Sequence, residues 1–402
     1  GSTATYWDGH TTTKAEENML KYSTDLSNSY YLTRGFAITS STETAPDGTS
    51  TAFKFTENSG DSNPAILPSA NTGVAGEVTF SVYLKADSAS TIVINNDGAT
   101  QQNTVNLTTS WQRFEVTSAT TNTAPRFHIG GFGTVTNGGG QVFYMWGPQH
   151  EYRDSATAYT PTTSAPIVKY QPTLQTAASG EARFDHDPLT SESKGLLIEE
   201  ARTNLYPNSA TLGNNNVGPS SYIETAVGLD GASNSTVVYT SLAAGSSYIQ
   251  ATNFNLTSGT TYTISCWAKL IAGSNSDLGG PFYSPAAPFA SNTIGKSDIN
   301  SETWTRVYAT ATATASGGTN ATLIGYDAQP GTRLAYFGLQ IEAGSFPTSY
   351  IPTSGSTVTR SSEDAELPSS SWYDHSGTLF VDFNMAGDST NTFGTIIQLV
   401  EA

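Results

Sequence analysis

The chain has 402 residues, of which 37% are hydrophobic, enough for the cores of two or three domains. Only 13% are charged, and Ser, Thr, Asn and Gly supply much of the polarity, which favours a β-rich protein over a helical one. The net charge of −17 disfavours nucleic acid as a partner, and without any run of 18 apolar residues we expect no membrane insertion.

Residues 1–17 are predicted to form an N-terminal arm, and residues 18–165 to form a first module. In the strand Thr79–Lys85 of this module, apolar side chains alternate with others, so Tyr83 and Lys85 fall on the face opposite Phe80, Val82 and Leu84. This period of two is typical of a half-buried antiparallel strand.

Residues 204–360 repeat the landmarks of residues 18–165 in the same order. Each copy has an opening Asn, an Asp-Gly turn, an aromatic residue two before a Lys, a Trp-x-Arg, a Gly-x-Gln-x-Glu and a closing Tyr-x-Pro-Thr. The pairs are Asn18 and Asn204, Asp47 and Asp230, Tyr83 and Trp267, Trp111 and Trp304, Gln149 and Gln340, and Tyr159 and Tyr350. So many ordered matches indicate a duplicated module. The predicted fold is all-β, with tandem antiparallel β-sandwich jelly rolls.

The rest of the chain lies between and after these modules. Residues 166–203 are rich in turns and are predicted to be a β connector. Residues 361–402 begin a new alternating pattern, and we expect them to be the opening strands of a truncated third β domain.

The landmarks resemble the jelly-roll carbohydrate-binding modules first known from cellulases and xylanases. The connector from Ala182 to Leu205 resembles a segment of phage tail and head-fibre proteins, where it joins such modules and often precedes a concanavalin-like lectin domain. The stretch from Trp372 to Phe383 fits the start of such a domain. The resemblance implies a non-catalytic structural protein of the virion surface, a fibre or a decoration, that attaches to a host or matrix glycan.

Two alternatives remain open from the sequence. In the first, the modules act as spacers and oligomer contacts without a ligand. In the second, they form the accessory part of a secreted, extracellular enzyme that degrades polysaccharides. As partners we expect a surface polysaccharide, other virion proteins and further copies of the chain, with a trimer favoured because fibres present several weak sites on closed cyclic assemblies.

The candidate ligand residues share one face of each module. Tyr83 and Trp267 offer aromatic platforms for a sugar ring, and the hydrogen-bonding partners are Lys85, Gln149, Glu151, Lys269, Gln340 and Glu342. Each role has a competing interpretation without a ligand. For Tyr83 and Trp267, the ring would brace a neighbouring strand, and for Lys85, the side chain would pair with Glu151 across a solvated sheet.

No nucleophile elbow or phosphate-binding loop occurs in the sequence, and the five histidines lack close metal spacing, so we expect neither catalysis nor a cofactor. Modules of this type borne by enzymes often hold a structural calcium ion. Here Gln149 and Gln340 stand where the resemblance leads us to expect acidic residues, which argues against that site.

Overall fold

A computed structural model describes residues 4–58, 64–69, 76–96, 102–120, 127–130, 141–209, 216–232, 234–243, 247–278, 282–283, 296–325, 328–365 and 380–382. Within these ranges the chain forms β-strands and two short 3-10 helices, η2 (Asn275–Asp277) and η3 (Lys296–Asp298), and no α-helix. The predicted all-β class is confirmed. No helix in this part of the chain has the length and apolar character needed to cross a bilayer.

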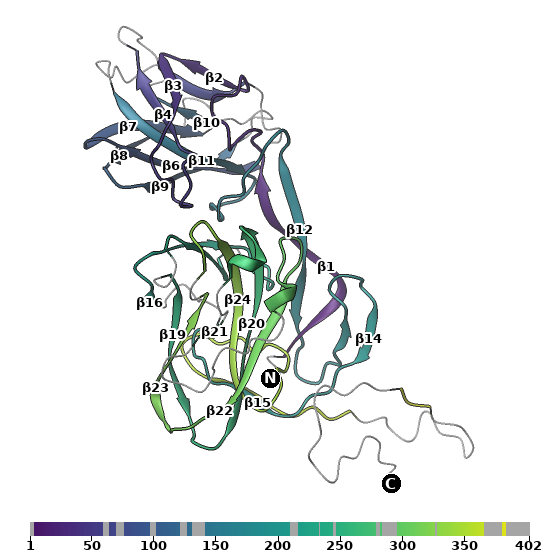
Figure 1. Ribbon diagram of the computed structural model, residues 1–402. Coiled ribbons are helices and arrows are strands. Elements are labelled where there is room, and N and C mark those ends of the chain that lie inside the picture. The colour runs from purple at the N-terminus through teal and green to yellow at the C-terminus, as the bar shows by residue number, and fades with distance from the viewer. Residues whose placement is uncertain are drawn as a thin grey trace.

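Module 1 is a sandwich of two antiparallel five-stranded sheets (Figure 1). Sheet A1 has the order β3 (Phe36–Ser40), β4 (Phe53–Glu57), β11 (Val142–Glu151), β6 (Gly76–Ala86) and β9 (Gln112–Thr120). Sheet B1 has the order β2 (Tyr31–Arg34), β5 (Ala65–Pro68), β10 (Phe127–Ile129), β7 (Ser90–Asn96) and β8 (Gln102–Leu107). The core lies between the sheets, where Phe80 of A1 stacks on Phe127 of B1 with ring centroids 4.1 Å apart.

Module 2 is a second sandwich with its own core. Sheet A2 has the order β17 (Ser221–Ala226), β18 (Thr236–Ser241), β24 (Arg333–Ala343), β20 (Thr261–Ala272) and β22 (Thr305–Thr312). Sheet B2 has the order β16 (Asn216–Val217), β19 (Ile249–Leu256), β23 (Gly317–Ile324) and β21 (Phe282–Tyr283). The strands that carry the repeated landmarks occupy equivalent places in A1 and A2.

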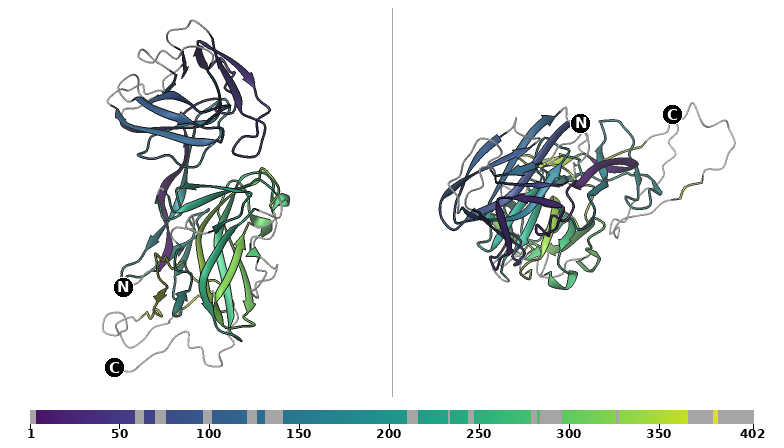
Figure 2. Two further views of the ribbon diagram at one scale, coloured as in Figure 1. Left: turned by 90° about the vertical axis from the view of Figure 1, so that its left-hand side faces the viewer. Right: turned by 90° about the horizontal axis from the view of Figure 1, so that it is seen from above.

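A long two-stranded ribbon links the modules. Its strands are β1 (Thr5–Asn18) and β12 (Ile167–Thr176), which pair antiparallel with irregularities between Trp7 and Thr12 and between Lys14 and Glu16. The ribbon leaves module 1 and runs along the side of module 2 (Figures 1 and 2). There the Gln171 side chain donates to the Gly228 carbonyl over 2.8 Å, and the Leu174 amide donates to the Leu229 carbonyl over 2.6 Å.

Two smaller pairs complete the connector. Strands β13 (Phe184–His186) and β14 (Ser193–Leu196) form a hairpin, and β15 (Arg202–Asn204) pairs with β25 (Val358–Arg360) at the end of module 2. The third domain expected over residues 361–402 lies almost wholly outside the described residues, which there include only 361–365 and 380–382.

Candidate functional site

The candidate ligand residues lie on the face of A1 and A2 that points away from the core, as the alternation predicts. In module 1 this face is covered. Tyr83 is only 1% exposed, and its ring packs against Trp146, which in turn packs against Tyr159, with centroid distances of 5.2 and 4.7 Å. Tyr159 belongs to the segment that follows β11 and returns over the sheet.

Module 2 repeats this arrangement with Trp267. The residue is 6% exposed, and its ring packs against Phe337 and Tyr350 in a buried cluster that also contains Leu174 of the ribbon. The Arg306 guanidinium lies 4.6 Å from the ring centroid. The expected open platforms are therefore wrong for both Tyr83 and Trp267, because other parts of the same chain occupy the faces that a sugar would need. The competing interpretation, that these rings brace their surroundings, describes the observed packing.

In each module, the Gln-x-Glu pair forms hydrogen bonds with the segment that follows the closing strand and returns over the sheet. Gln149 donates to the Glu151 carboxylate over 2.8 Å and accepts from the Thr160 amide over 2.6 Å. In module 2, Gln340 likewise donates to the Glu342 carboxylate and accepts from the Ile351 amide, and both distances are 2.7 Å. All four glutamine and glutamate side chains are buried, so they hold the chain's own backbone rather than face solvent.

Burial also changes the acidity of Glu151. Removal from water raises the pKa of this carboxyl to about 7, against the opposing effect of hydrogen bonds from Thr157 and Gln149. The fold therefore favours the protonated acid below neutral pH.

The two candidate lysines form ion pairs. Lys85 pairs with Glu43 over 2.5 Å, and not with Glu151 as the competing interpretation holds. Lys269 pairs with Glu16 of the ribbon over 2.7 Å. Each of the eight predicted residues thus has an intramolecular role.

A glycine bulge in each closing strand makes the aromatic packing feasible. Gly147 and Gly338 have φ values of +60° and +66°, which favour glycine. A β-carbon at Gly147 would lie 3.3 Å from the Tyr159 ring, and one at Gly338 would lie 3.2 Å from the Trp267 ring. The repeated Gly-x-Gln-x-Glu landmark therefore combines a close-packing position with the hydrogen-bonding pair.

Sequence reasoning missed the cluster that joins the modules. Glu224 of β17 is buried and accepts from Tyr83 (2.5 Å), Arg113 (3.1 Å) and Arg333 (2.7 Å). Burial alone would raise the pKa of Glu224, but the charges of Arg333 and Arg113 and the Tyr83 hydroxyl outweigh it, so this pKa is lowered. The partners lie more than a hundred positions away in the sequence, so no local pattern signals the cluster.

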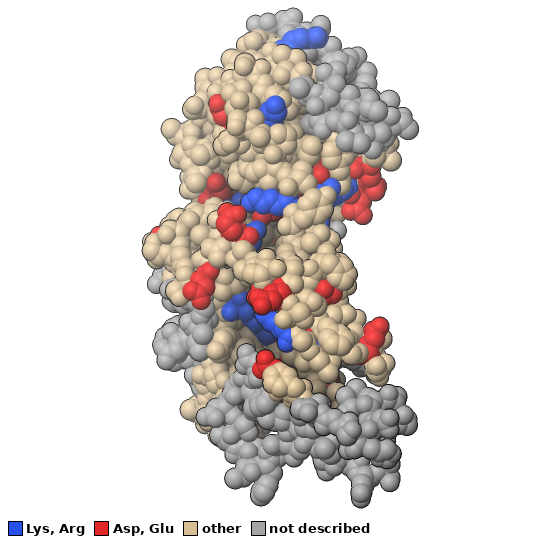
Figure 3. Space-filling model, turned by 90° about the vertical axis from the view of Figure 1, so that its right-hand side faces the viewer, with Lys and Arg blue, Asp and Glu red and all other residues tan. Residues whose placement is uncertain are grey.

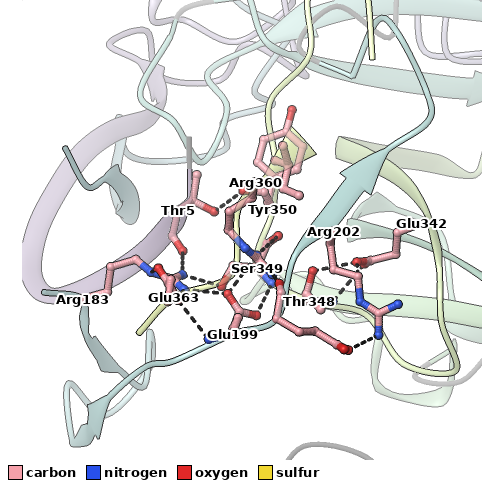
Figure 4. A network of polar contacts seen from close by, with 12 residues as sticks. Thr5, Arg183, Glu199, Arg202, Glu342, Thr348, Ser349, Tyr350, Arg360 and Glu363 are labelled. Carbon is pink, nitrogen blue, oxygen red and sulfur yellow. Dashed lines mark hydrogen bonds and ion pairs between the residues drawn. The ribbon is translucent and has the colours of Figure 1, made fainter. Parts of the chain in front are cut away.

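A comparable network closes the far end of module 2 (Figure 4). Arg183 of the connector donates to Glu199 over 2.8 Å and to Glu363 over 2.7 Å. Glu199 also accepts from the Ser349 amide and pairs with Arg360, over 2.8 and 2.9 Å. The segment that returns over module 2 is thus held to the connector by charged groups.

A cleft of about 220 Å³ lies where module 1, the ribbon and module 2 meet. Its floor is the outer face of A2, with the half-buried Trp304 at one side. The ribbon contributes Glu16 and Lys169, and module 1 contributes residues 157–161. Basic and acidic side chains gather at this junction on the face shown in Figure 3. Among the described residues, no group of three or more His, Cys, Asp or Glu side chains is arranged to hold a metal ion.

No protein-family model and no curated protein matches this chain. Among solved structures, it is similar to the N-terminal CBM22-1–CBM22-2 tandem domain of Paenibacillus barcinonensis Xyn10C, with 12% identity, coverage of 83% of this chain and 99% of that one, and a TM-score of 0.26. A CBM4 structure matches with 15% identity, 31% and 78% coverage and a TM-score of 0.23. A mutant of a family 29 carbohydrate-binding module matches with 13% identity, 35% and 91% coverage and a TM-score of 0.23. These values do not place the chain in any of those families.

Proposed function

We propose that this protein is a non-catalytic structural protein of a phage virion surface, a fibre or decoration, whose two jelly-roll modules attach as one rigid body to a surface glycan. The observation that carries the proposal is the docking of the modules through Glu224. The Glu224 carboxylate of module 2, which also binds Arg333 of its own module, accepts hydrogen bonds from Tyr83 and Arg113 of module 1. These bonds fix the relative orientation of the modules, because hydrogen bonds to a charged group form only where donor and acceptor meet in the right geometry.

Rigid docking matters for attachment. A fixed pair of modules loses less conformational entropy when it binds a glycan than a flexible pair does. The β1–β12 ribbon adds to this rigidity, since Thr5, Glu16, Gln171 and Leu174 of the ribbon each bond to module 2. The glycan part of the proposal is supported by the resemblance of the repeated landmarks and of the connector sequence.

A specific observation favours a second candidate, the spacer without a ligand. All eight residues predicted to bind a sugar make intramolecular contacts, and the aromatic faces are covered. A spacer needs the same rigid docking and no open site.

The two candidates differ in one measurement. The complete chain is applied to an array of bacterial surface polysaccharides, with heat-denatured protein as the control. Saturable binding to a defined polysaccharide supports attachment, and its absence on an array that includes the host's own surface glycans favours the spacer. Antibody labelling of phage particles in electron micrographs tests the virion location, and unlabelled particles would contradict it.

We also propose a homo-oligomer, with a trimer favoured, and contacts with other virion proteins. Six of the ten large apolar side chains that are exposed in the described part of the chain lie on β12 and the connector: Val168, Tyr170, Phe184, Leu189, Leu196 and Ile198. Such a concentration is typical of surfaces that meet another protein chain. Light scattering tests the assembly, and a monomer at all concentrations would contradict it.

A further inference from the structure

We infer that the cleft between the two modules binds one uncharged sugar residue of a glycan. This inference rests on the proposed attachment function and assigns it a site. None of the residues predicted from the sequence to bind a ligand forms the centre of this site, although Lys269 borders it.

The cleft is built from three separate parts of the chain. Val238, Ile271 and Ala335 form an apolar floor on A2, the ribbon forms one wall, and residues 157–161 of module 1 cover it. The site is therefore complete only while the modules are docked through Glu224. Its volume of about 220 Å³ is below the range of roughly 300–1,000 Å³ that suits drug-sized ligands, which limits the occupant to about one sugar ring.

Trp304 provides the aromatic wall. Its indole N–H donates to the Gln171 side-chain oxygen of the ribbon over 2.9 Å, so the ring is held in place. The ring also packs beside the Val238 and Ala335 cluster of the floor. A fixed indole next to an apolar floor suits the C–H face of a sugar ring, and little further ordering is needed on binding.

Glu16 provides oriented polar contacts. Its carboxylate is held between Lys269 at 2.7 Å and Lys169 at 3.3 Å. The Lys169 side chain is about half exposed and has three N–H donors, of which the ion pair with Glu16 needs one. The pair thus offers both acceptors and donors to sugar hydroxyls.

Thr236 supplies independent support for a ligand with hydroxyl groups. Thr236 is one of the residues around the cleft and is fully buried, and its Oγ1 has no hydrogen-bond partner among the described residues. A buried hydroxyl without a partner is unfavourable, so a hydroxyl-bearing occupant gains from pairing with it.

The charged side chains that line the cleft favour uncharged sugars over acidic ones. The acidic and basic side chains that line the cleft are Glu16, Glu302, Lys169 and Lys269, two of each sign, so the lining is formally neutral. An uncharged sugar fits this balance better than a uronic or sialic acid, whose carboxylate would also approach a chain with a net charge of −17.

The test uses the complete chain and saturation-transfer NMR titrations with glucose, galactose, mannose, rhamnose and N-acetylglucosamine, and with glucuronate as the charged probe. We expect at least one neutral sugar to bind with a millimolar Kd and glucuronate to bind more weakly. Thr236→Val keeps the side-chain shape and should weaken that binding about 5–10-fold, as loss of one hydrogen bond predicts. It should not lower the melting temperature, because the hydroxyl has no partner to lose.

Trp304→Ala should abolish binding. Trp111→Ala changes the matched position in module 1, which is not one of the cleft-lining residues, and should leave binding unchanged. If Trp304→Ala fails to fold, the Thr236 variant still decides. Binding that is unchanged in Thr236→Val, or glucuronate preferred over every neutral sugar, would overturn the inference, and so would a cleft that holds water alone and binds none of the sugars. If polysaccharides bind on the array while Thr236→Val has no effect, the attachment function stands and the cleft assignment fails.

Discussion

The Tyr83 hydroxyl of module 1 donates a hydrogen bond to the Glu224 carboxylate of module 2 over 2.5 Å. The sequence placed Tyr83 on the outer face of its sheet, and the structure uses that position to join the modules. The same carboxylate pairs with Arg113 and Arg333, and all three side chains are largely buried at the junction. The orientation of the modules therefore depends on a few charged groups whose removal has large effects.

Glu224→Ala should destabilise the docked pair by about 3–5 kcal/mol, because it leaves two largely buried arginines without their counter-charge. Tyr83→Phe removes only one hydrogen bond to a charged group and should cost about 1.5–3 kcal/mol. Urea denaturation measures both changes, and small-angle scattering shows whether the modules separate. The exposed Glu115→Ala is the matched control. A Glu224 variant as stable as this control would contradict the docking role.

The free energy of unfolding should carry a pH-dependent contribution from Glu151. Burial raises its pKa from 4.5 to about 7 in the folded state, so its contribution is fully present below pH 4.5 and is lost as pH rises to about 7. The shift corresponds to about 3 kcal/mol at 1.36 kcal/mol per unit. Glu151→Gln, which stays uncharged, should reduce the fall in stability between pH 5 and pH 8, measured by denaturation at each pH. Glu115→Gln should leave the fall unchanged, and an equal fall in both variants would refute the assignment.

Trp267→Ala should lower the stability of module 2 by about 3–5 kcal/mol, since it opens a cavity among Phe337, Tyr350 and Leu174. Differential scanning calorimetry of the complete chain measures the effect on the transition of module 2. Trp304→Ala should cost less, because that ring is only half-buried. A melting temperature unchanged by Trp267→Ala would mean that the ring does not belong to the packed interior.

The segments 18–165 and 204–360 should each fold alone, because each contains a separate core between two sheets. The first segment should be less stable than the same region in the complete chain, since it lacks Glu224 as a partner for Arg113 and Tyr83. Circular dichroism during urea denaturation tests both expectations. A segment without a cooperative transition would show that the two modules share one folding unit.

The sequence by itself determined the all-β class, the duplicated landmarks and the face of each strand on which the candidates lie. Phe80, Val82 and Leu84 are in the core, and Tyr83 is on the opposite face, because alternation along a strand follows directly from backbone geometry. The sequence also placed Gln149 near Glu151, since two residues apart on a strand share a face.

Only the tertiary structure decided what covers that face. Trp267 lies in one buried cluster with Leu174 of the ribbon and Tyr350 of the returning segment, and Glu224 pairs with Arg113 from the other module. These contacts join residues about 80 to 110 positions apart, and their geometry depends on how whole sheets, ribbon and bulges pack. A period of two tells which side of a strand a residue occupies, but burial on that side depends on distant parts of the chain, so the cleft beside Trp304 emerged only from the packed molecule.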